Sequence, residues 1–250
     1  MIDIHTHILP MVDDGASCFD EALDMAVMAA ESGVQALVAT PHSNHDIGYV
    51  NYESEHLASL FEKLCALLIE SKIPLRLYRG MELWASTDIV EKLSYGKLLT
   101  LNFTRYTLVE FAFDEEPWWI EAILREIFSG GYSPIIAHPE RYLCVHEDPS
   151  YLYEWRKMGA LAQMNKESIL GRLGRRTAEV AELLLKHNLI NCVASDAHHA
   201  YVRTTDMRAL DRYLERNFSQ GYRDLLMHDN PQAILEGKQL MMAGNFRCID

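Results

Sequence analysis

The sequence predicts an α/β barrel, because short apolar runs alternate with helical patterns and polar residues follow most of the runs. Seven runs resemble strands, and they cover residues 1–4, 34–39, 75–79, 106–112, 133–137, 160–164 and 190–194. A doubly wound open sheet is the other architecture that this alternation allows. No Gly-x-Gly-x-x-Gly fingerprint follows the first run, however, so the barrel is favoured.

The first helix is predicted from signals at both of its ends. Ser17 precedes Asp20 by three residues, which is the spacing of a capping box, and an amphipathic segment follows at 21–32. Gly33 stands directly after this segment, as glycine commonly does at a helix C-terminus. We therefore expect a helix that Ser17 caps and Gly33 ends.

Two later helices carry similar signals. Residues 118–129 form an amphipathic segment that Gly130-Gly131 ends, and Asn230-Pro231 opens a last short helix. No internal repeat, low-complexity tract or linker interrupts the alternation of strands and helices. Residues 1–250 are therefore expected to form a single domain.

Composition and charge exclude several classes of protein. A formal net charge of -13, with no cluster of Lys and Arg, argues against a nucleic-acid surface. No apolar run reaches the ~20 residues that cross a bilayer, and the first strand begins at Met1. We therefore expect no membrane insertion, no signal peptide and a cytoplasmic location.

The five cysteines predict reduced thiols rather than a disulfide framework or a nucleophile. They are scattered without a Cys-x-x-Cys pair. None is followed six positions later by the arginine that a cysteine phosphatase loop needs. Packing is the expected role of these side chains.

Histidines and acids follow almost every apolar run, a recurrence that core packing does not require. His5 and His7 stand two positions apart at the end of the first run, and on a strand this spacing directs both at one point. In a barrel, such side chains collect at the carboxyl ends of the strands. The other candidates are Asp13, Asp14, His42, Glu82, Glu110, His138, Asp196 and His198.

The candidate ligands are imidazoles and carboxylates without thiolates, a set suited to Mn, Zn, Fe or Mg rather than to copper or an iron-sulfur cluster. Their number exceeds the needs of one ion. Two or three ions bridged by a carboxylate would generate hydroxide at neutral pH and clamp the oxygens of a phosphoryl group. The sequence therefore outlines a hydrolytic metal site.

Six segments in chain order carry a family resemblance. They are MIDIHTHILPMVDDGA at the start, ALVATPHSN, Gly-Met-Glu at 80–82, LVEF at 108–111, IIAHPERY at 135–142 and VASDAHHAYVRT at 193–204. Over essentially its whole length the chain resembles the polymerase and histidinol phosphatase (PHP) superfamily. Within it, the chain is most similar to the bacterial manganese-dependent protein-tyrosine phosphatases encoded with capsule and exopolysaccharide genes. The resemblance implies a distorted TIM-like (β/α)7 barrel, the PHP fold, with a metal site at the C-terminal ends of the strands.

The resemblance also implies how the ligands divide among the ions, for which manganese is implied and Zn, Fe, Co or Mg are alternatives. A first ion would be held by His5, His7, Glu82 and Asp196. A second would be held by Glu110 and His138 together with Glu82, which would bridge the two ions. A third would be held by Asp14, His42 and His198.

Arg141 and Arg203 are implied to hold the phosphate oxygens, a role that suits the fork of donors on a guanidinium. From the residues alone, Arg141 could instead pair with Glu140, and Arg203 could belong to a solvated basic face. The implied nucleophile is a metal-bound hydroxide. No general acid can be named, and a leaving tyrosinate, whose phenol has a pKa of about 10, has little need of one.

Three acidic candidates have alternatives of their own. Glu110 could be a strand carboxylate that faces water, although its apolar neighbours favour a buried carboxylate that needs a partner or a metal. Asp13 and Asp14 could form a turn before Gly15; Asp14 is the favoured ligand and the role of Asp13 stays open. The chain departs from the family pattern at Ser43 and in the segment at 162–171.

The resemblance implies a metal-dependent protein-tyrosine phosphatase whose partner is a phosphotyrosine protein, namely a bacterial tyrosine autokinase that regulates capsular or exopolysaccharide synthesis. A small-molecule phosphatase of the same superfamily, acting on histidinol phosphate or a nucleotide, is the first alternative. An inactive regulatory homologue is the second. Several aromatic residues could line an aryl-accepting mouth or serve only in packing, and these are Tyr49, Tyr52, Trp118, Trp119, Tyr142 and Tyr201.

Overall fold

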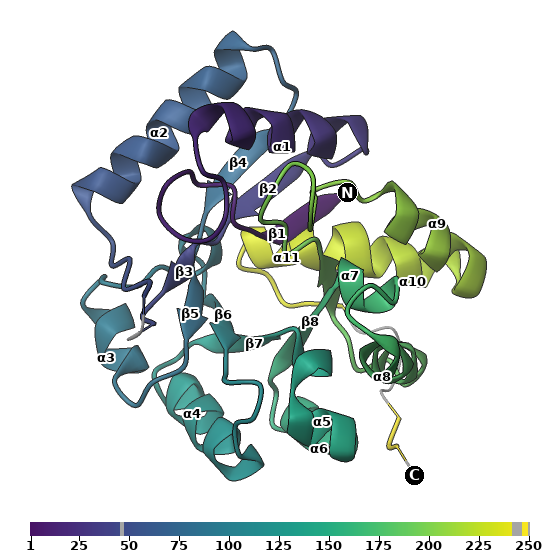
Figure 1. Ribbon diagram of the computed structural model, residues 1–250. Coiled ribbons are helices and arrows are strands. Elements are labelled where there is room, and N and C mark those ends of the chain that lie inside the picture. The colour runs from purple at the N-terminus through teal and green to yellow at the C-terminus, as the bar shows by residue number, and fades with distance from the viewer. Residues whose placement is uncertain (46–47, 242–246, 250) are drawn as a thin grey trace.

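The computed structural model describes residues 1–45, 48–241 and 247–249, and in these residues parallel strands curl into a barrel surrounded by helices (Figure 1). The strands are β1 (Ile2–Thr6), β2 (Ala36–Ala39), β3 (His42–Ser43), β4 (Arg76–Arg79), β5 (Glu82–Trp84), β6 (Tyr106–Glu110), β7 (Ser133–Ala137), β8 (Leu161–Asn165) and β9 (Cys192–Ala194). Each of the seven predicted runs overlaps a strand, and β1 and β8 extend past the predicted ends by two residues and one residue. The predicted α/β barrel is thereby confirmed.

The strands pair in two parallel sheets, in the orders β1-β2-β4 and β3-β5-β6-β7-β8-β9. The His7 amide donates to the Ala197 carbonyl and the Asp196 amide donates to the His5 carbonyl, both at 2.9 Å, which joins the first strand to the end of the last. β2 stops before Pro41, which has no amide hydrogen to donate. The sequence did not predict β3 and β5, because two or three residues carry no periodic signal.

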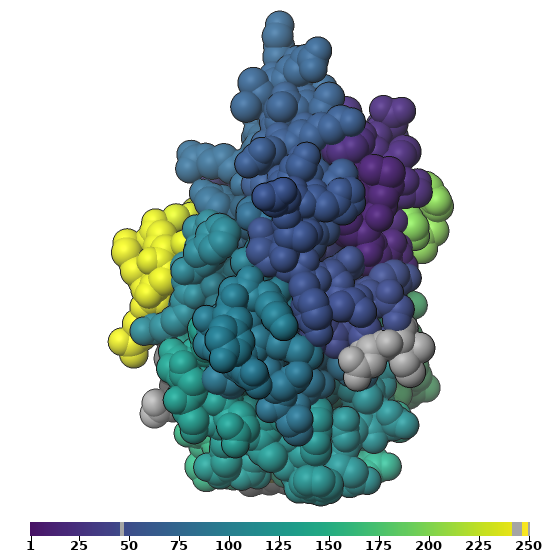
Figure 2. Space-filling model, turned by 90° about the vertical axis from the view of Figure 1, so that its left-hand side faces the viewer, coloured from purple at the N-terminus to yellow at the C-terminus, as the bar shows by residue number. Residues whose placement is uncertain are grey.

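Helices cover the barrel on its outside (Figure 1). They are α1 (Phe19–Glu31), α2 (Glu55–Glu70), α3 (Ile89–Ser94), α4 (Pro117–Ser129), α5 (Leu143–Glu147), α6 (Ser150–Lys157), α7 (Lys166–Ile169), α8 (Arg175–Lys186), α9 (Arg208–Asn217), α10 (Gln220–Asp224) and α11 (Asn230–Leu235). Short 3-10 turns lie at Leu101–Phe103 and Pro139–Arg141, and a π turn lies at Leu225–Asp229. The end of α2 projects at the top of the molecule (Figure 2). Among the described residues, no helix is long and apolar enough to cross a membrane.

The predicted cap of the first helix is wrong. Residue Cys18 occupies the N-cap position of α1, without a side-chain capping bond. Ser17 instead uses its hydroxyl and its amide to donate to the Glu21 carboxylate, at 2.6 and 2.8 Å. Because Glu21 engages both groups of Ser17, the chain turns into the helix one residue later than the capping box predicts. Gly33 follows the helix with a φ of 91°, as expected for a left-handed terminating residue.

The other two helix predictions agree with the structure. Pro117 stands in the first turn of α4, and Gly130 is its C-cap. Asn230 begins α11. The apolar stripe that α4 buries has the spacing of one helix face and consists of Ile120, Ile123, Leu124 and Ile127.

The buried apolar residues form two clusters, and neighbouring residues of a strand alternate between them. Leu108 belongs to the smaller cluster, which includes residues of α11, whereas Val109 belongs to the larger one, which includes residues of α1, α2, α4 and α8. Side chains alternate across a strand, so a buried strand must supply apolar groups to both faces. Apolar packing therefore holds both faces of the strands and leaves their carboxyl ends to polar residues.

Candidate metal centre

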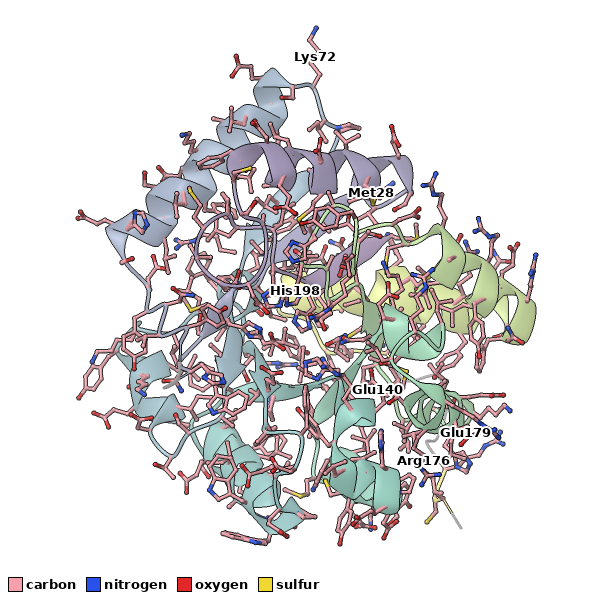
Figure 3. All side chains as sticks on the ribbon, in the orientation of Figure 1. Met28, Lys72, Glu140, Arg176, Glu179 and His198 are labelled. Carbon is pink, nitrogen blue, oxygen red and sulfur yellow. The ribbon has the colours of Figure 1, made fainter. Side chains whose placement is uncertain are left out.

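The predicted ligands converge at the carboxyl ends of the strands. They come from the end of β1 and the loop after it, from the starts of β3 and β5, which follow the ends of β2 and β4, from the end of β6 and from the residues just after β7 and β9. Figure 3 shows His198 near the centre of the ribbon, where many side chains meet, whereas Lys72 and Arg176 lie at the periphery. Side chains that are far apart in sequence thus form one polar group in the middle of the molecule.

The innermost part of this group, which we call the deep cluster, consists of His5, His7, Glu82 and Asp196. The Nε2 atom of His5 lies 3.2 Å from a Glu82 oxygen and 3.4 Å from an Asp196 oxygen. The Nε2 atom of His7 lies 3.4 Å from an oxygen of each carboxylate. All four side chains are buried. Two imidazoles and two carboxylates therefore face one point away from water.

Asp13 orients one ring of the deep cluster. The Nδ1 atom of His7 donates to Asp13 Oδ2 at 2.8 Å, and the same oxygen accepts the His42 amide at 2.9 Å. The second Asp13 oxygen accepts the Gly15 amide at 2.9 Å. Because Asp13 holds a proton on Nδ1, the neutral form of His7 presents the lone pair of its Nε2 to the deep cluster. Asp13, whose role the sequence left open, therefore acts as a hydrogen-bond acceptor for His7 and for the His42 amide.

A chain of amides orients the other ring. Asp196 can only accept, so Asn165 Nδ2 donates to it, at 2.5 Å. Asn165 Oδ1 then accepts from Gln163 Nε2 at 2.9 Å, which leaves Gln163 Oε1 to accept from His5 Nδ1 at 3.0 Å. The amide directions are set by the acceptor-only carboxylate, and the His5 tautomer follows from them. His5 therefore also presents the lone pair of its Nε2 to the deep cluster.

The deep cluster fits a metal ion. The two Nε2 atoms lie 3.3 Å apart, so protons on both of them would repel each other. Burial lowers the pKa of His7, but Asp13, Asp196 and Glu82 outweigh it, so that the pKa lies well above its ordinary value. The site thus attracts positive charge, and one cation can satisfy both nitrogens and both carboxylates at once.

A second set of donors shares Glu82. The Nε2 atom of His138 lies 3.1 Å from Glu82 and 3.5 Å from Glu110. Burial and the neighbouring Glu82 carboxylate raise the pKa of Glu110 to about 8. Burial, with a contribution from the Arg141 charge, lowers the pKa of His138 to about 4. A neutral imidazole beside two carboxylates is the donor set that a second divalent ion would take.

A third set, which we call the rim cluster, consists of Asp14, His42 and His198. The Nε2 atoms of both histidines lie 3.5 Å from the same Asp14 oxygen. The Nδ1 atom of His42 faces the other way and lies 2.9 Å from Glu82. The Asp14 side chain is 49% exposed, so the rim cluster opens to solvent.

Both predicted arginines face the deep cluster. Arg203 donates to Asp196 Oδ2 at 2.6 Å, and Arg141 lies 3.7 Å from the same oxygen. The guanidinium of Arg141 also lies over the ring of Phe113, 4.2 Å from its centre. Glu140 is buried and accepts the amide of Asn165, so it is not the group at which Arg141 points. Both guanidinium groups thus lie beside one carboxylate of the deep cluster.

Comparison with known proteins identifies the family. A family model described as capsular polysaccharide synthesis, CpsB/CapC, matches residues 1–236. The chain belongs to the CpsB/CapC family. The tyrosine-protein phosphatase YwqE of Bacillus subtilis (strain 168) is 35% identical over 240 residues, which are 96% of this chain and 93% of that protein. The tyrosine-protein phosphatase CpsB of Streptococcus agalactiae serotype V is 29% identical, over 94% of this chain and 98% of its own.

Solved structures agree with this membership of the CpsB/CapC family. A crystal structure from work on YwqE of Bacillus subtilis and CpsB of Streptococcus pneumoniae, described as unique metal-dependent tyrosine phosphatases, matches with a TM-score of 0.93. It is 33% identical in sequence, and the match covers 100% of both chains. The lactonase Lmo2620 of Listeria monocytogenes matches with a TM-score of 0.61 at 12% identity, which shows a shared fold alone.

Three of the candidate site residues of this CpsB/CapC chain have a left-handed backbone. His138, Asp196 and Arg203 have φ angles of 35°, 49° and 49°. Such angles are costly for residues with a side chain, and they are concentrated at functional sites. Gly15 meets a different constraint, because a Cβ there would lie 2.1 Å from the His7 carbonyl oxygen. The loop after β1 therefore needs glycine to pass close to a candidate ligand.

The sequence did not predict the roles of Gln163 and Asn165. Both lie in the segment at 162–171, which departs from the family pattern. Both are buried at the end of β8, and an amide in a buried strand is itself a signal, because a buried polar group requires a partner. The sequence could not tell that the partners are two candidate metal ligands.

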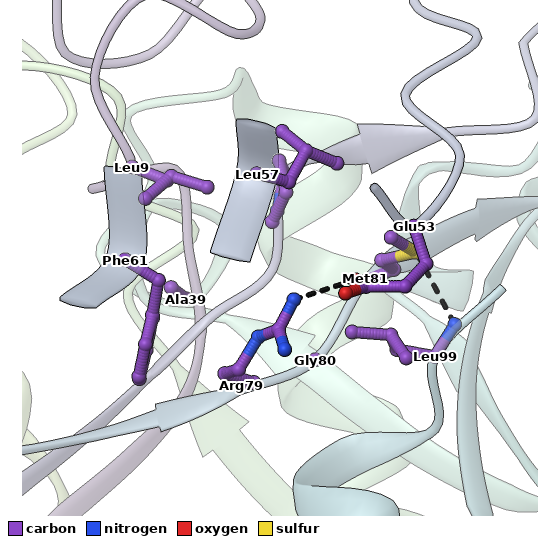
Figure 4. A pocket seen from close by; sticks show the side chains of 10 residues that line it. Leu9, Ala39, Glu53, Leu57, Phe61, Arg79, Gly80, Met81 and Leu99 are labelled. Atoms are coloured by element: carbon purple, nitrogen blue, oxygen red, sulfur yellow. Dashed lines mark hydrogen bonds and ion pairs between the residues drawn. The ribbon is translucent and has the colours of Figure 1, made fainter. Parts of the chain in front are cut away.

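A small hollow lies outside the metal centre, beneath α2 (Figure 4). Arg79 crosses it to reach Glu53 at 2.5 Å, and its remaining space is about 10 Å³, the size of one water molecule. Leu57 and Phe61 of α2 line it together with Leu99. It is therefore a packing defect that the Arg79–Glu53 ion pair largely fills, and it is too small for a substrate.

Proposed function

We propose that the protein is a metal-dependent protein-tyrosine phosphatase that uses two or three manganese ions. Its partner in this proposal is a bacterial tyrosine autokinase that regulates capsular or exopolysaccharide synthesis in the cytoplasm. Tyrosine phosphatases of the CpsB/CapC family align with nearly the whole chain, so residues 1–250 serve as one phosphatase domain. The observation that carries the proposal is the deep cluster, where two imidazole lone pairs and two carboxylates face one point.

The ligands divide as the family resemblance implies. In this division one ion would be held by His5, His7, Glu82 and Asp196, the second by Glu82, Glu110 and His138, and the third by Asp14, His42 and His198. Such a centre supplies an activated water molecule and stabilises the negative charge on the oxygens of a phosphoryl group. The His5 and His7 tautomers support this role, because each ring keeps its proton on the side away from the ligand position.

The two arginines bind and orient the phosphate. Arg203 and Arg141 converge on Asp196 from different loops, so a phosphate beside this carboxylate meets a guanidinium on each side. Phe113 supports Arg141 through its ring face. The two guanidinium groups hold the phosphate ester so that its leaving oxygen points away from the metal ligands. Tyrosinate can leave without a strong general acid, because the pKa of its phenol is about 10.

The deciding experiment measures phosphate release from a phosphotyrosyl peptide and from histidinol phosphate, with added manganese, for the wild type and His138→Ala. We expect a preference for the peptide and the loss of about a thousandfold in kcat/KM in the variant. A preference for histidinol phosphate would instead indicate a biosynthetic phosphatase with the same metal centre. Release that is unchanged in His138→Ala would refute the metal assignment, and no release from either substrate would favour an inactive regulator.

A further inference from the structure

An aromatic pocket adjoins the metal centre. It encloses about 280 Å³ and is bordered by Tyr49, Trp84, Phe111 and Phe113, together with two candidate ligands, His42 and Glu110. The walls come from His45 and Tyr49 after β3, from β5 and from the segment after β6. The pocket therefore opens directly beside the donors that would hold the ions.

Ring contacts join one wall of the pocket to the metal centre. The Tyr49 ring stacks on the His42 ring, with centres 5.8 Å apart and planes 12° apart. The Trp84 ring lies 4.2 Å from the ring of His45 on the same side. Because His42 also lies 2.9 Å from Glu82, the wall is continuous with the donors of the deep cluster.

Another lining residue, Phe113, joins the pocket to the predicted phosphate-binding arginine. The Phe113 ring carries the Arg141 guanidinium 4.2 Å above its centre and lies 6.0 Å from the ring of His138. Phe113 is 40% exposed, so a ligand in the pocket can reach its ring. A phosphate held by Arg141 would thus have an aromatic wall directly beside it.

The size and chemistry of the pocket select among phosphate esters. Pockets for drug-sized ligands span roughly 300–1,000 Å³, and this one is slightly smaller, at about 280 Å³, which suits a single ring better than a nucleotide. Aromatic rings pair favourably with other rings, by offset stacking or by edge-to-face contact. A phenyl ring fits this lining, whereas a short alkyl group would leave it largely unfilled.

We propose that Tyr49, Trp84 and Phe113 form the subsite for the phenyl ring of phosphotyrosine, and that this subsite makes the enzyme prefer aryl over alkyl phosphate esters. The inference rests on the proposed function, because the metal centre and Arg141 must hold the phosphate. Of the aromatic residues considered from the sequence, Tyr49 is part of this subsite. It adds Trp84 and Phe113, which the sequence had not singled out.

Other aromatic candidates have different places. The Tyr142 side chain is buried, and its hydroxyl donates to the Ala137 carbonyl at 2.9 Å, so it is a packing residue. Trp118 is 68% exposed and Tyr201 is 76% exposed, and neither lines the pocket. Trp118 is therefore a matched control for Trp84, since it has the same side chain outside the subsite.

The test compares two ligands that differ only in the ring. Phenylphosphonate and methylphosphonate are titrated calorimetrically into the manganese-loaded full chain. We expect the wild type to bind phenylphosphonate about tenfold more tightly, as one ring packed against aromatic walls allows. In Trp84→Ala this ratio falls to about twofold or less, whereas Trp118→Ala keeps the ratio of the wild type. Circular dichroism and manganese content show whether each variant is folded and loaded.

The outcomes separate this inference from the proposed function. Equal binding of the two phosphonates by the wild type would overturn the subsite while leaving the metal centre intact, as would an unchanged ratio in Trp84→Ala. Binding of neither phosphonate by the loaded wild type would overturn the phosphate site itself, and the subsite with it. Should Trp84→Ala not fold, Phe113→Leu keeps an apolar side chain and removes the ring, and it is expected to lower the ratio in the same way.

Discussion

The deep cluster and the rim cluster contain the same kinds of ligand but differ in their support. His5 and His7 are buried, and each has its remaining ring nitrogen bonded to a partner, Gln163 or Asp13. In the rim cluster, by contrast, Asp14 is 49% exposed and comes from the loop after β1. Burial and second hydrogen bonds therefore hold the deep donors in place, while the rim cluster depends on a solvent-exposed carboxylate from a loop.

The largest predicted effect is in the deep cluster. Glu82→Gln keeps the size of the side chain but removes the charge that two ions would share. We expect kcat/KM for a phosphotyrosyl peptide to fall about a thousandfold, with loss of bound manganese measured by atomic absorption. A variant that retains its manganese and more than a tenth of its activity would show that Glu82 bridges no ions.

The hydrogen bonds that orient the deep cluster can be removed without changing a metal ligand. Gln163→Leu removes the acceptor that keeps the His5 proton on Nδ1. We expect a loss of about 10- to 100-fold in manganese affinity or activity, which is typical of hydrogen-bond partners of metal ligands. Gln232→Leu is the control, because Gln232 bonds to Glu236 on α11 at an exposed position. Equal activity in the two variants would mean that the amide chain does not support the site.

The rim cluster is predicted to be more tolerant. Asp14→Asn keeps an oxygen ligand but removes a charge that solvent already screens. We expect kcat/KM to fall by about tenfold or less, and two ions to remain bound. If Asp14→Asn lowered kcat/KM as much as Glu82→Gln, the rim cluster would contribute to catalysis as much as the deep cluster does.

The metal-free protein should lose stability as the pH rises from 7 to 9. Burial lowers the pKa of His5 and His42, but the Glu82 carboxylate outweighs it, and both values are raised. Protons on these rings stabilise the fold below the unfolded value of about 6.5, and this stabilisation is lost as the pH passes through the raised values. Glu110, with its pKa raised to about 8, acts in the same direction, because its ionised form disfavours the fold.

Two histidines act in the opposite sense, but only at lower pH. Burial lowers the pKa of His138 to about 4 and also lowers that of His198, so both are neutral in either state above about 6.5. Thermal unfolding after EDTA treatment is the measurement, and Tm should fall by about 3 °C or more between pH 7 and 9. Manganese-loaded protein should show a smaller change, and a rising Tm in the metal-free protein would contradict the prediction.

The smallest predicted effect concerns the thiols. Cys18 and Cys248 are exposed and should react with iodoacetamide, whereas burial raises the pKa of the Cys144 thiol to about 11 and slows its reaction. Activity should change by less than about twofold, while EDTA abolishes it. Inactivation by iodoacetamide in the presence of manganese would indicate a cysteine nucleophile.

The sequence by itself was enough to predict the strands and the ligand types. Apolar runs of strand length are local patterns, and polar residues such as His5 and Glu110 stand at their ends, where a barrel of parallel strands must bring them together. The short strands β3 and β5 were missed, since the breaks before them depend on how β2 and β4 pair with their neighbours. Capping by Ser17 was wrong because the Glu21 carboxylate competes for the same groups.

Only the tertiary structure decided which polar groups support the ligands and where a ring can enter. Gln163 and Asn165 lie on one strand, but the groups that give them a role lie on β1 and after β9. The direction of each hydrogen bond follows from the acceptor at the far end of the chain, which no local pattern contains. The aromatic pocket likewise arises where Trp84 of β5 and Phe113, after β6, line one space, because its shape is a property of packing between segments and not of any one of them.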